Sequence, residues 1–353
     1  MRYTMAVRDK NLFKDFLCEE REYLHTVSFE DKDKDTICDL LLKQFTINNP
    51  GYAGDKGILK WFYETAVDED DVVYIIDFGN RQFTEYGVID RDDFRKAVLK
   101  QEAELKRFAD KAEYIKKTFD KNTIERKSSI ATGFSKFTFF DVDNGIEIPF
   151  RLKEVKGEEK RPLLIFFHGA GCVGEDNFKQ IAEFRSMGIK LTEECFVLVP
   201  QSNHFTGNNL STINLYTKSV GSLVKMLVES YPVDPERIYV TGISYGGACT
   251  WYSVYNNPGL YAAAIPLMGY FPDVDSDKFD ADVFKGEKIW AGHAADDEDV
   301  SSDSDEKMYE KLRGKCDIRL SLYPSGGHTV MRRFYGREKW QEWMFAQKRT
   351  DKD

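Results

Sequence analysis

The sequence predicts an α/β fold with a mostly parallel central sheet flanked by helices, preceded by a mainly helical N-terminal extension. The run 161–167 is apolar without a polar alternation, as expected for a central strand of a parallel sheet, which is buried on both faces. A second apolar run, 238–243, leads through a Gly-x-Ser-x-Gly turn into the helix-compatible segment 248–256. Further along, a helical stretch at 305–313 precedes a strand at 318–323.

The chain divides near residue 130, into an accessory region 1–129 and a main domain 130–353. A single core rarely grows beyond about 250–300 residues, so an additional part is expected in a chain of 353. Residues 36–45 and 58–66 have the apolar spacing of helices, whereas 72–78 fits a strand or a short buried helix.

An apolar stripe at a/d positions predicts a helix over residues 90–120. Such a stripe packs within its own subunit or, as the sharper hypothesis, forms a coiled-coil-like contact in a homodimer.

The main domain is expected to begin with the strands 134–141 and 146–155, joined by the hairpin signal Asp143-Asn-Gly145. The buried strand 161–167 and a further strand at 195–200 follow.

Ser244 is the candidate nucleophile. It is the central residue of Gly242-x-Ser-x-Gly246. A tight strand-to-helix turn lifts a serine Oγ out of the sheet and points the next backbone N–H at the atom that Oγ attacks. Glycines two residues before and after the serine are needed because a Cβ there would collide with the neighbouring strand and helix.

A histidine follows in the position that a Ser–Asp–His arrangement requires. His328 lies in a glycine-rich loop after the strand 318–323, where its imidazole can reach a serine on another loop. His328 is therefore the candidate general base.

The candidate acid lies in the loop that follows the apolar strand beginning at residue 288. This loop offers Asp296, Asp297 and Asp299. Val300 can dock back on the protein and point Asp297 inward, which favours Asp297 over Asp296.

The loop after 161–167 is the candidate oxyanion hole. Its backbone donor is the N–H of Ala170, with Gly171 as the alternative, and Tyr245 supplies the second donor. Each such donor stabilises a developing oxyanion by about 3–4 kcal/mol. His168 is expected to brace this loop.

Three residues are candidates for substrate contact: Gly171, His204 and Phe205. The last two stand in the loop 201–209, which leaves its strand on the same edge as the serine turn; a plain surface-loop role fits them equally well.

Residues 134–345 resemble the α/β-hydrolase superfamily, in particular esterases of the polyhydroxybutyrate-depolymerase, feruloyl-esterase and acetyl-xylan-esterase type. The resemblance rests on several stretches in register: His168-Gly-Ala-Gly171, Val199-Pro-Gln201, 233–247, 293–300 and Tyr323-Pro-Ser-Gly-Gly-His328. It implies that 130–353 is an α/β-hydrolase catalytic domain acting on carboxylic esters, such as acylated carbohydrates or small acyl esters. Tyr245 stands where these enzymes usually have methionine, and its ring is expected to influence which acyl group fits.

Two other functions remain open. The first is a serine peptidase like prolyl oligopeptidase, although the N-terminal part is too short and too helix-like for a propeller. The second is a binding or scaffolding protein with an idle hydrolase domain, which an intact triad argues against.

Composition excludes some partners. The net charge of −10 and a pI near 5.3 argue against nucleic acids and anionic membranes. The six cysteines show no short paired spacing, and no metal motif is present, so neither a metal nor another cofactor is expected. The N-terminus lacks the apolar core of a signal peptide, which favours a cytoplasmic location.

Overall fold

The computed structural model describes the backbone of residues 2–9, 23–30, 72–77, 86–90, 107, 109–131, 133–203, 210–276, 279–337 and 339–349. Contacts divide the chain into two units, Met1–Lys111 and Ala112–Asp353. Within the described part of the chain, no helix is long and apolar enough to cross a membrane.

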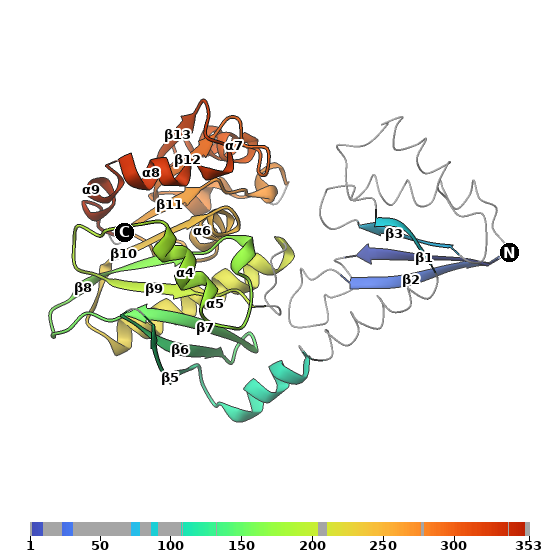
Figure 1. Cartoon of the computed structure of the whole chain (residues 1–353), viewed down its shortest axis with the longest axis horizontal. Helices are drawn as coiled ribbons and strands as arrows, with labels where there is room; N and C mark the ends of the chain where they lie inside the picture. The colour runs from blue at the N-terminus through green and yellow to red at the C-terminus, as the bar shows by residue number, and fades with distance from the viewer. Residues whose placement is uncertain are drawn as a thin grey trace. The chain divides into compact units, whose positions relative to one another are not determined.

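The N-terminal unit contains a four-stranded sheet in the order β2-β1-β3-β4 (Figure 1). Its strands are β1 (Arg2–Asp9), β2 (Tyr23–Glu30), β3 (Val72–Asp77) and β4 (Tyr86–Asp90). The prediction of a mainly helical region missed this sheet, because pairings such as Ala6 with Ile75 join residues far apart in sequence. Of the stretch 72–78, residues 72–77 form a strand; residue 78 and the expected helices at 36–45 and 58–66 lie outside the described residues.

The larger unit is built on a nine-stranded sheet in the order β13-β12-β11-β10-β8-β9-β7-β6-β5 (Figure 1). The strands from β13 to β9 in this order are parallel, and β7, β6 and β5 continue the sheet antiparallel. This confirms the mostly parallel sheet. The strands are β5 (Thr123–Ala131), β6 (Phe134–Asp141), β7 (Ile146–Lys153), β8 (Arg161–Phe167), β9 (Phe196–Pro200), β10 (Val233–Ile243), β11 (Ala263–Leu267), β12 (Lys288–Ala294) and β13 (Asp317–Tyr323).

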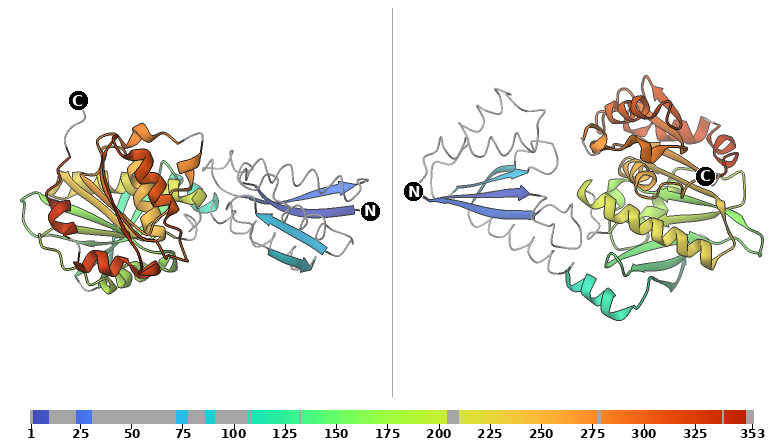
Figure 2. Two further views of the ribbon diagram at one scale, coloured as in Figure 1. Left: turned by 90° about the horizontal axis from the view of Figure 1, so that it is seen from above. Right: turned by 180° about the vertical axis from the view of Figure 1, so that it is seen from behind.

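Helices flank this sheet, as predicted (Figure 2). α5 and α6 pack against each other and on β10, and α7 contacts β12 and β13. α4, α8 and α9 contribute to a separate buried cluster with the sheet. The helices are α4 (Lys179–Ser186), α5 (Leu210–Ser230), α6 (Tyr245–Asn256), α7 (Asp303–Leu312), α8 (Met331–Arg337) and α9 (Trp340–Phe345).

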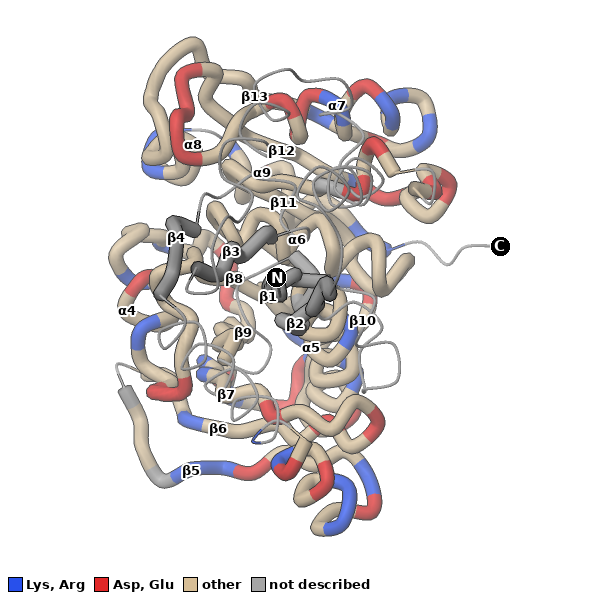
Figure 3. Tube along the Cα trace, turned by 90° about the vertical axis from the view of Figure 1, so that its right-hand side faces the viewer, with Lys and Arg blue, Asp and Glu red and all other residues tan. Residues whose placement is uncertain are grey.

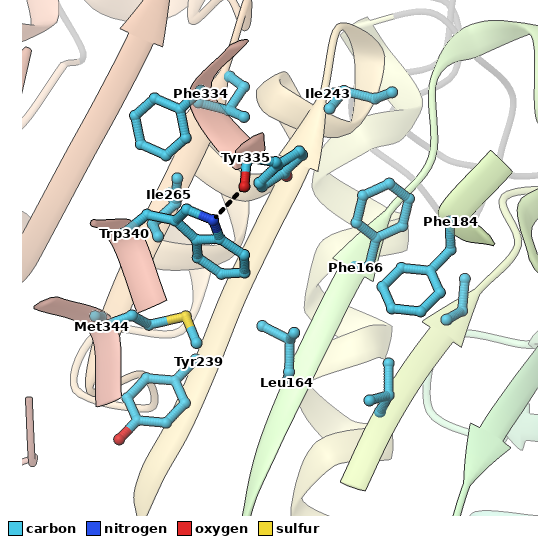
Figure 4. Packing of buried hydrophobic residues seen from close by; sticks show 14 of the residues in the cluster. Leu164, Phe166, Phe184, Tyr239, Ile243, Ile265, Phe334, Tyr335, Trp340 and Met344 are labelled. Atoms are coloured by element: carbon cyan, nitrogen blue, oxygen red, sulfur yellow. Dashed lines mark hydrogen bonds between the residues drawn. The ribbon is translucent and has the colours of Figure 1, made fainter. Parts of the chain in front are cut away.

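β8 is buried on both faces, which explains its unbroken apolar sequence. On one face Leu164 and Phe166 join the cluster that Figure 4 shows, together with Trp340 of α9. On the other face the ring of Phe167 lies 5.7 Å from that of Tyr216 in α5. Side chains of a strand alternate between faces, so only a continuous apolar run can fill both layers.

A helical segment at 109–118 leads into the large sheet. Ala112 and Ile115 on this segment are buried, and the ring of Phe119 stacks on Phe140 at 4.6 Å. β5 follows and pairs with β6, so the expected boundary at 129/130 falls inside a strand of the larger unit. Residues 91–106 of the expected helix lie outside the described part.

The turn from β10 to α6 is closely packed against β8. A Cβ on Gly242 would lie 2.3 Å from the carbonyl oxygen of Gly246, and a Cβ on Gly246 would lie 2.1 Å from that of Phe167. Real Cβ atoms do not approach backbone so closely, so both positions require glycine. Ser244 between them has φ 56° and ψ −119°, a conformation that L residues rarely adopt.

Gly246→Ala is expected to destabilise the protein by about 3 kcal/mol or to prevent folding, because the added methyl group meets backbone that cannot move aside. Urea unfolding followed by circular dichroism measures the change. Gly336→Ala in α8 is the matched control, since a Cβ there has no neighbour within 4 Å. Equal stability of the two variants would contradict the packing argument.

Candidate active site

Hydrogen bonds connect Ser244 to His328 and His328 to Asp297. His328 Nε2 is 2.8 Å from Ser244 Oγ, and His328 Nδ1 is 2.8 Å from Asp297 Oδ2. The three residues follow β10, β13 and β12, whose parallel arrangement brings their C-terminal ends to one edge of the sheet. Asp297 rather than Asp296 contacts the histidine.

The loop after β12 holds Asp297 in this orientation. Asp297 Oδ1 accepts the backbone N–H groups of Asp299 and Val300, each at 3.0 Å, which leaves Oδ2 directed at His328. Burial alone would raise the pKa of Asp297. The hydrogen bonds from His328, Val300 and Asp299 outweigh that effect and hold the pKa below its usual value, so Asp297 is a carboxylate near neutral pH.

Asp296 has a different place. Its carboxylate accepts the backbone N–H of Gly327 at 2.8 Å and of Gly326 at 3.2 Å. Both glycines have positive φ, 143° at Gly326 and 52° at Gly327, so the turn before His328 depends on their freedom. Asp296 therefore links the loop after β12, which carries Asp297 (the acid loop), to the loop after β13, which carries His328 (the histidine loop).

The loop after β8 presents Ala170 and Gly171 on the surface near the end of the strand. Gly169, just before them, donates its N–H to Glu183 Oε2 of α4 at 2.7 Å. That N–H is therefore occupied, and Ala170 and Gly171 remain the candidate oxyanion donors of this loop. Burial is the main reason that the pKa of Glu183 is raised, with the Gly169 N–H partly offsetting it.

The next part of this loop is fastened to the end of β9. Gln201 accepts the N–H of Asn177 through Oε1 at 2.6 Å and donates through Nε2 to the carbonyl oxygen of Cys172 at 2.9 Å. Asp176 Oδ1 accepts the N–H groups of Phe178 and Lys179 at the start of α4. Polar side chains thus fix a loop whose own backbone pairing is limited to a short 3-10 turn at Ala170–Cys172.

His168, at the start of the same loop, hydrogen-bonds to the loop and to the segment after β9. Its Nδ1 lies 2.8 Å from the carbonyl oxygen of Gly169, and its Nε2 lies 2.9 Å from the backbone nitrogen of Ser202. One partner accepts and the other donates, so the neutral Nδ1–H tautomer satisfies both. Burial lowers the pKa of His168 to about 4.

The ring of Tyr245 turns into the protein. Tyr245 is 1% exposed, and its hydroxyl is 3.1 Å from Ser202 Oγ. The expectation that this ring influences the fit of the acyl group is not supported, because the ring presents no open surface. A phenol needs a hydrogen-bond partner when buried, and the end of β9 supplies one. The backbone N–H of Tyr245 remains a candidate oxyanion donor.

Of the three predicted substrate contacts, Gly171 alone lies in the described part of the chain. Gly171 is exposed, with nothing within 4 Å of the place a Cβ would occupy. His204 and Phe205 lie outside the described residues.

Among the described residues, the potential ligand atoms of Asp297, Asp299 and His328 lie within 4.8 Å of one another. The Asp297–His328 hydrogen bond already uses two of these residues, so a cation there would have to break that bond.

Sequence reasoning missed a buried cluster behind the acid. His293 at the end of β12 contacts Asp305 of α7, and Asp305 accepts the indole N–H of Trp251 from α6. The spacing His293-x-x-x-Asp297 is the one sequence signal that could have placed His293 near Asp297. Nothing in the sequence distinguished Asp305 from the neighbouring acidic residues of α7, because contact across elements decides it.

Acid destabilisation is expected to depend on His168. The folded protein holds the pKa of His168 near 4, below its ordinary 6.5, so folding favours the neutral form. The contribution to stability is complete above pH 6.5 and falls as the pH drops toward about 4, by up to about 3 kcal/mol. Urea unfolding at both ends of this range, in wild type and in His168→Gln, measures it. An identical pH dependence in the two proteins would contradict the assignment.

The fold and the site have counterparts in known proteins. Residues 211–339 match the model of the Dienelactone hydrolase family. A crystal structure of a thermostable esterase is 31% identical, with a TM-score of 0.51, over 62% of this chain and 64% of that one.

Two curated relatives are more distant in sequence. A probable carboxylesterase SOBER1-like from Arabidopsis thaliana is 24% identical over 48% of this chain and 73% of its own length. Poly(3-hydroxyalkanoate) depolymerase C from Paucimonas lemoignei is 24% identical over 181 residues. The match covers 45% of this chain and 43% of the depolymerase. The sheet, its flanking helices and these similarities together show that residues 112–353 have the α/β-hydrolase fold.

Proposed function

We propose that the chain is a serine hydrolase that cleaves carboxylic esters through an acyl-enzyme intermediate. The observation that carries this proposal is the continuous chain of short contacts, 2.8 Å from Ser244 Oγ to His328 Nε2 and 2.8 Å from His328 Nδ1 to Asp297 Oδ2. A serine hydroxyl becomes a nucleophile when an oriented imidazole takes its proton, and this geometry suits that transfer.

In the proposed reaction, His328 removes the proton from Ser244 Oγ as the oxygen attacks the ester carbonyl. Asp297 accepts the Nδ1–H of His328 and stabilises the imidazolium that forms. His328 then gives the proton to the leaving alcohol. Water, activated by the same imidazole, attacks the acyl group on Ser244 and releases the acid.

The tetrahedral intermediate carries its negative charge on the former carbonyl oxygen. We assign the stabilising donors to the backbone N–H groups of Tyr245, at the start of α6, and of Ala170, with Gly171 as the alternative. The ties of Gly169 to Glu183 and of Gln201 to Cys172 fix the second loop before substrate arrives. Donors fixed in advance need no reorganisation when the charge develops.

An ester substrate is favoured over an amide by the relatives. The 31% identical structure is of an esterase, and the two curated relatives are a probable carboxylesterase and a polyester depolymerase. Acylated carbohydrates and small acyl esters are the proposed classes. The acidic net charge of −10, with Lys and Arg interspersed among Asp and Glu (Figure 3), gives no support to a nucleic-acid or membrane role.

Ser244→Ala is expected to abolish labelling by a fluorophosphonate probe and to lower kcat for p-nitrophenyl acetate by about 10⁶-fold, since no nucleophile remains. In-gel fluorescence and a spectrophotometric assay measure the two effects. Ser253→Ala is the control, because Ser253 is a buried serine on α6 outside the site. The Ser253→Ala protein should be labelled as strongly as the wild type. A folded wild type that the probe does not label would favour the idle scaffold instead.

Asp297→Asn is expected to lower kcat by roughly 10⁴-fold, because the amide no longer orients His328 or balances its charge. Asp296→Asn should have a far smaller effect, because Asp296 accepts backbone N–H groups of Gly326 and Gly327 and the hydrogen bond to His328 comes from Asp297. Steady-state kinetics on a panel of acetyl, feruloyl and longer acyl esters, with peptide amides included, compares the variants and tests ester preference. Equal losses in the two variants would contradict the assignment of the acid.

A homodimer through the helix expected at 90–120 stays a proposal. Burial of Ala112 and Ile115 within their own chain supports intrachain packing at these two positions. Light scattering of the full chain would decide its mass in solution.

A further inference from the structure

A second histidine–carboxylate pair lies behind Asp297. His293 and Asp305 are both completely buried, and His293 Nδ1 is 2.7 Å from Asp305 Oδ2. Asp305 Oδ1 accepts the indole N–H of Trp251 at 2.6 Å. The pair is closed to solvent, so it cannot touch a substrate and must act through its neighbours.

Both ring nitrogens of His293 face hydrogen-bond acceptors. Nε2 lies 2.9 Å from the carbonyl oxygen of Val300 and 3.3 Å from Asp297 Oδ2, whereas Nδ1 faces the carboxyl group of Asp305. In a neutral imidazole only one ring nitrogen carries a hydrogen. The other nitrogen would then face an oxygen acceptor with no hydrogen between them. The imidazolium form, with two N–H groups, satisfies both sides.

The donors around Asp305 favour placing the proton on His293. Burial raises the pKa of Asp305, but His293, the indole N–H of Trp251 and the backbone N–H of Gly269 oppose this effect by stabilising the ionised form. Burial alone would lower the pKa of His293, but Asp305, with help from Val300 and Asp297, outweighs burial and raises it. The charged groups that face His293 are Asp305 from α7 and Asp297 from its own loop.

His168 provides the contrast within the same molecule. It is equally buried, but its partners are one carbonyl oxygen and one N–H, which suit a neutral ring. The two histidines differ in the chemistry of their partners rather than in their burial. Buried imidazoles thus take their charge from what surrounds them.

We propose that His293 is a positioning residue of the active site: held as an imidazolium by Asp305, it fixes the loop from Asp297 to Val300 and keeps the Asp297 carboxylate directed at His328. This inference rests on the proposed serine-hydrolase function. Asp297 Oδ2 then has two facing donors, Nδ1–H of His328 at 2.8 Å and Nε2–H of His293 at 3.3 Å. The positive charge of His293 also offsets part of the negative charge that His328 experiences.

Nuclear magnetic resonance tests the charge without any activity assay. In protein labelled with ¹⁵N-histidine, the five histidines are few enough to assign with His293→Asn and His168→Gln. We expect imidazolium shifts at both nitrogens of His293 near neutral pH and the neutral Nδ1–H pattern for His168. A neutral His293 under these conditions overturns the proposal.

Kinetics tests the positioning role with a matched pair of variants. His293→Asn can keep a donor near Nδ1 but loses the one at Nε2, whereas His293→Gln can keep a donor near Nε2; both remove the charge. We expect kcat to fall by roughly 100-fold in the Asn variant, as for a small misplacement of a catalytic group, with KM little changed. The Gln variant should lose less. In both, the acidic limb of the pH–rate profile should move to higher pH, because Asp297 attracts the proton on His328 more strongly once the positive charge is gone.

Two tryptophan variants keep the test decisive if the His293 variants do not fold. Trp251→Phe removes the N–H donated to Asp305, along with part of a buried ring, and should shift the pH–rate profile in the same direction by a smaller amount. Trp290→Phe is the control for loss of an indole N–H, because Trp290 lies on β12, the strand that carries His293, but donates its N–H to Ser321. Equal profiles for the two tryptophan variants overturn the proposal.

Different results would contradict the serine-hydrolase function and the positioning role of His293. If the fluorophosphonate probe does not label the wild type, the proposed function fails, while the ¹⁵N shifts still report the charge of His293. If the wild type is active and folded His293 variants keep its kcat and pH–rate profile, the positioning role fails and the serine-hydrolase function stands.

Discussion

The contact between the β10–α6 turn and the end of β8 is the constraint on which the rest of the site depends. β8 and β10 pair in parallel at the middle of the sheet, so the serine turn and the candidate oxyanion loop leave the same edge. Gly246 packs against the carbonyl oxygen of Phe167, which fixes the distance between these two loops. The positive φ of Ser244 is held by that packing together with the hydrogen bond from its N–H to Leu267.

Side-chain hydrogen bonds stabilise the loops that this framework positions. Glu183, Gln201 and His168 hold the loop after β8, and Asp296 joins the acid loop to the glycines before His328. Each of these groups satisfies backbone N–H or C=O groups that irregular loops cannot pair among themselves. The side chains of Asp297 and His328 are therefore held by loops that hydrogen bonds fix in place. Such fixed groups are the condition for effective electrostatic stabilisation in the proposed reaction.

The hydrogen-bond partners of the two buried histidines also account for their protonation states. His168 sits between a donor and an acceptor and is neutral, whereas His293 sits between acceptors and is assigned the charged form. A buried cation costs free energy unless it is paired, and Asp305 supplies the pair. Asp297, the candidate acid, is in this way connected through His293 to Asp305 of α7 and Trp251 of α6.

The sequence by itself determined the α/β architecture, because unbroken apolar runs, hairpin signals and glycine-flanked turns are local patterns. It also singled out Ser244, His328 and Asp297, since their order along the chain and their loop contexts follow from connectivity. Only the tertiary structure placed them in contact, moved Asp296 to a bracing position and turned the Tyr245 ring inward. The N-terminal sheet and the His293–Asp305–Trp251 cluster escaped sequence reasoning for one physical reason: both are made by residues distant in the chain, and pairing across such distances leaves no local periodicity.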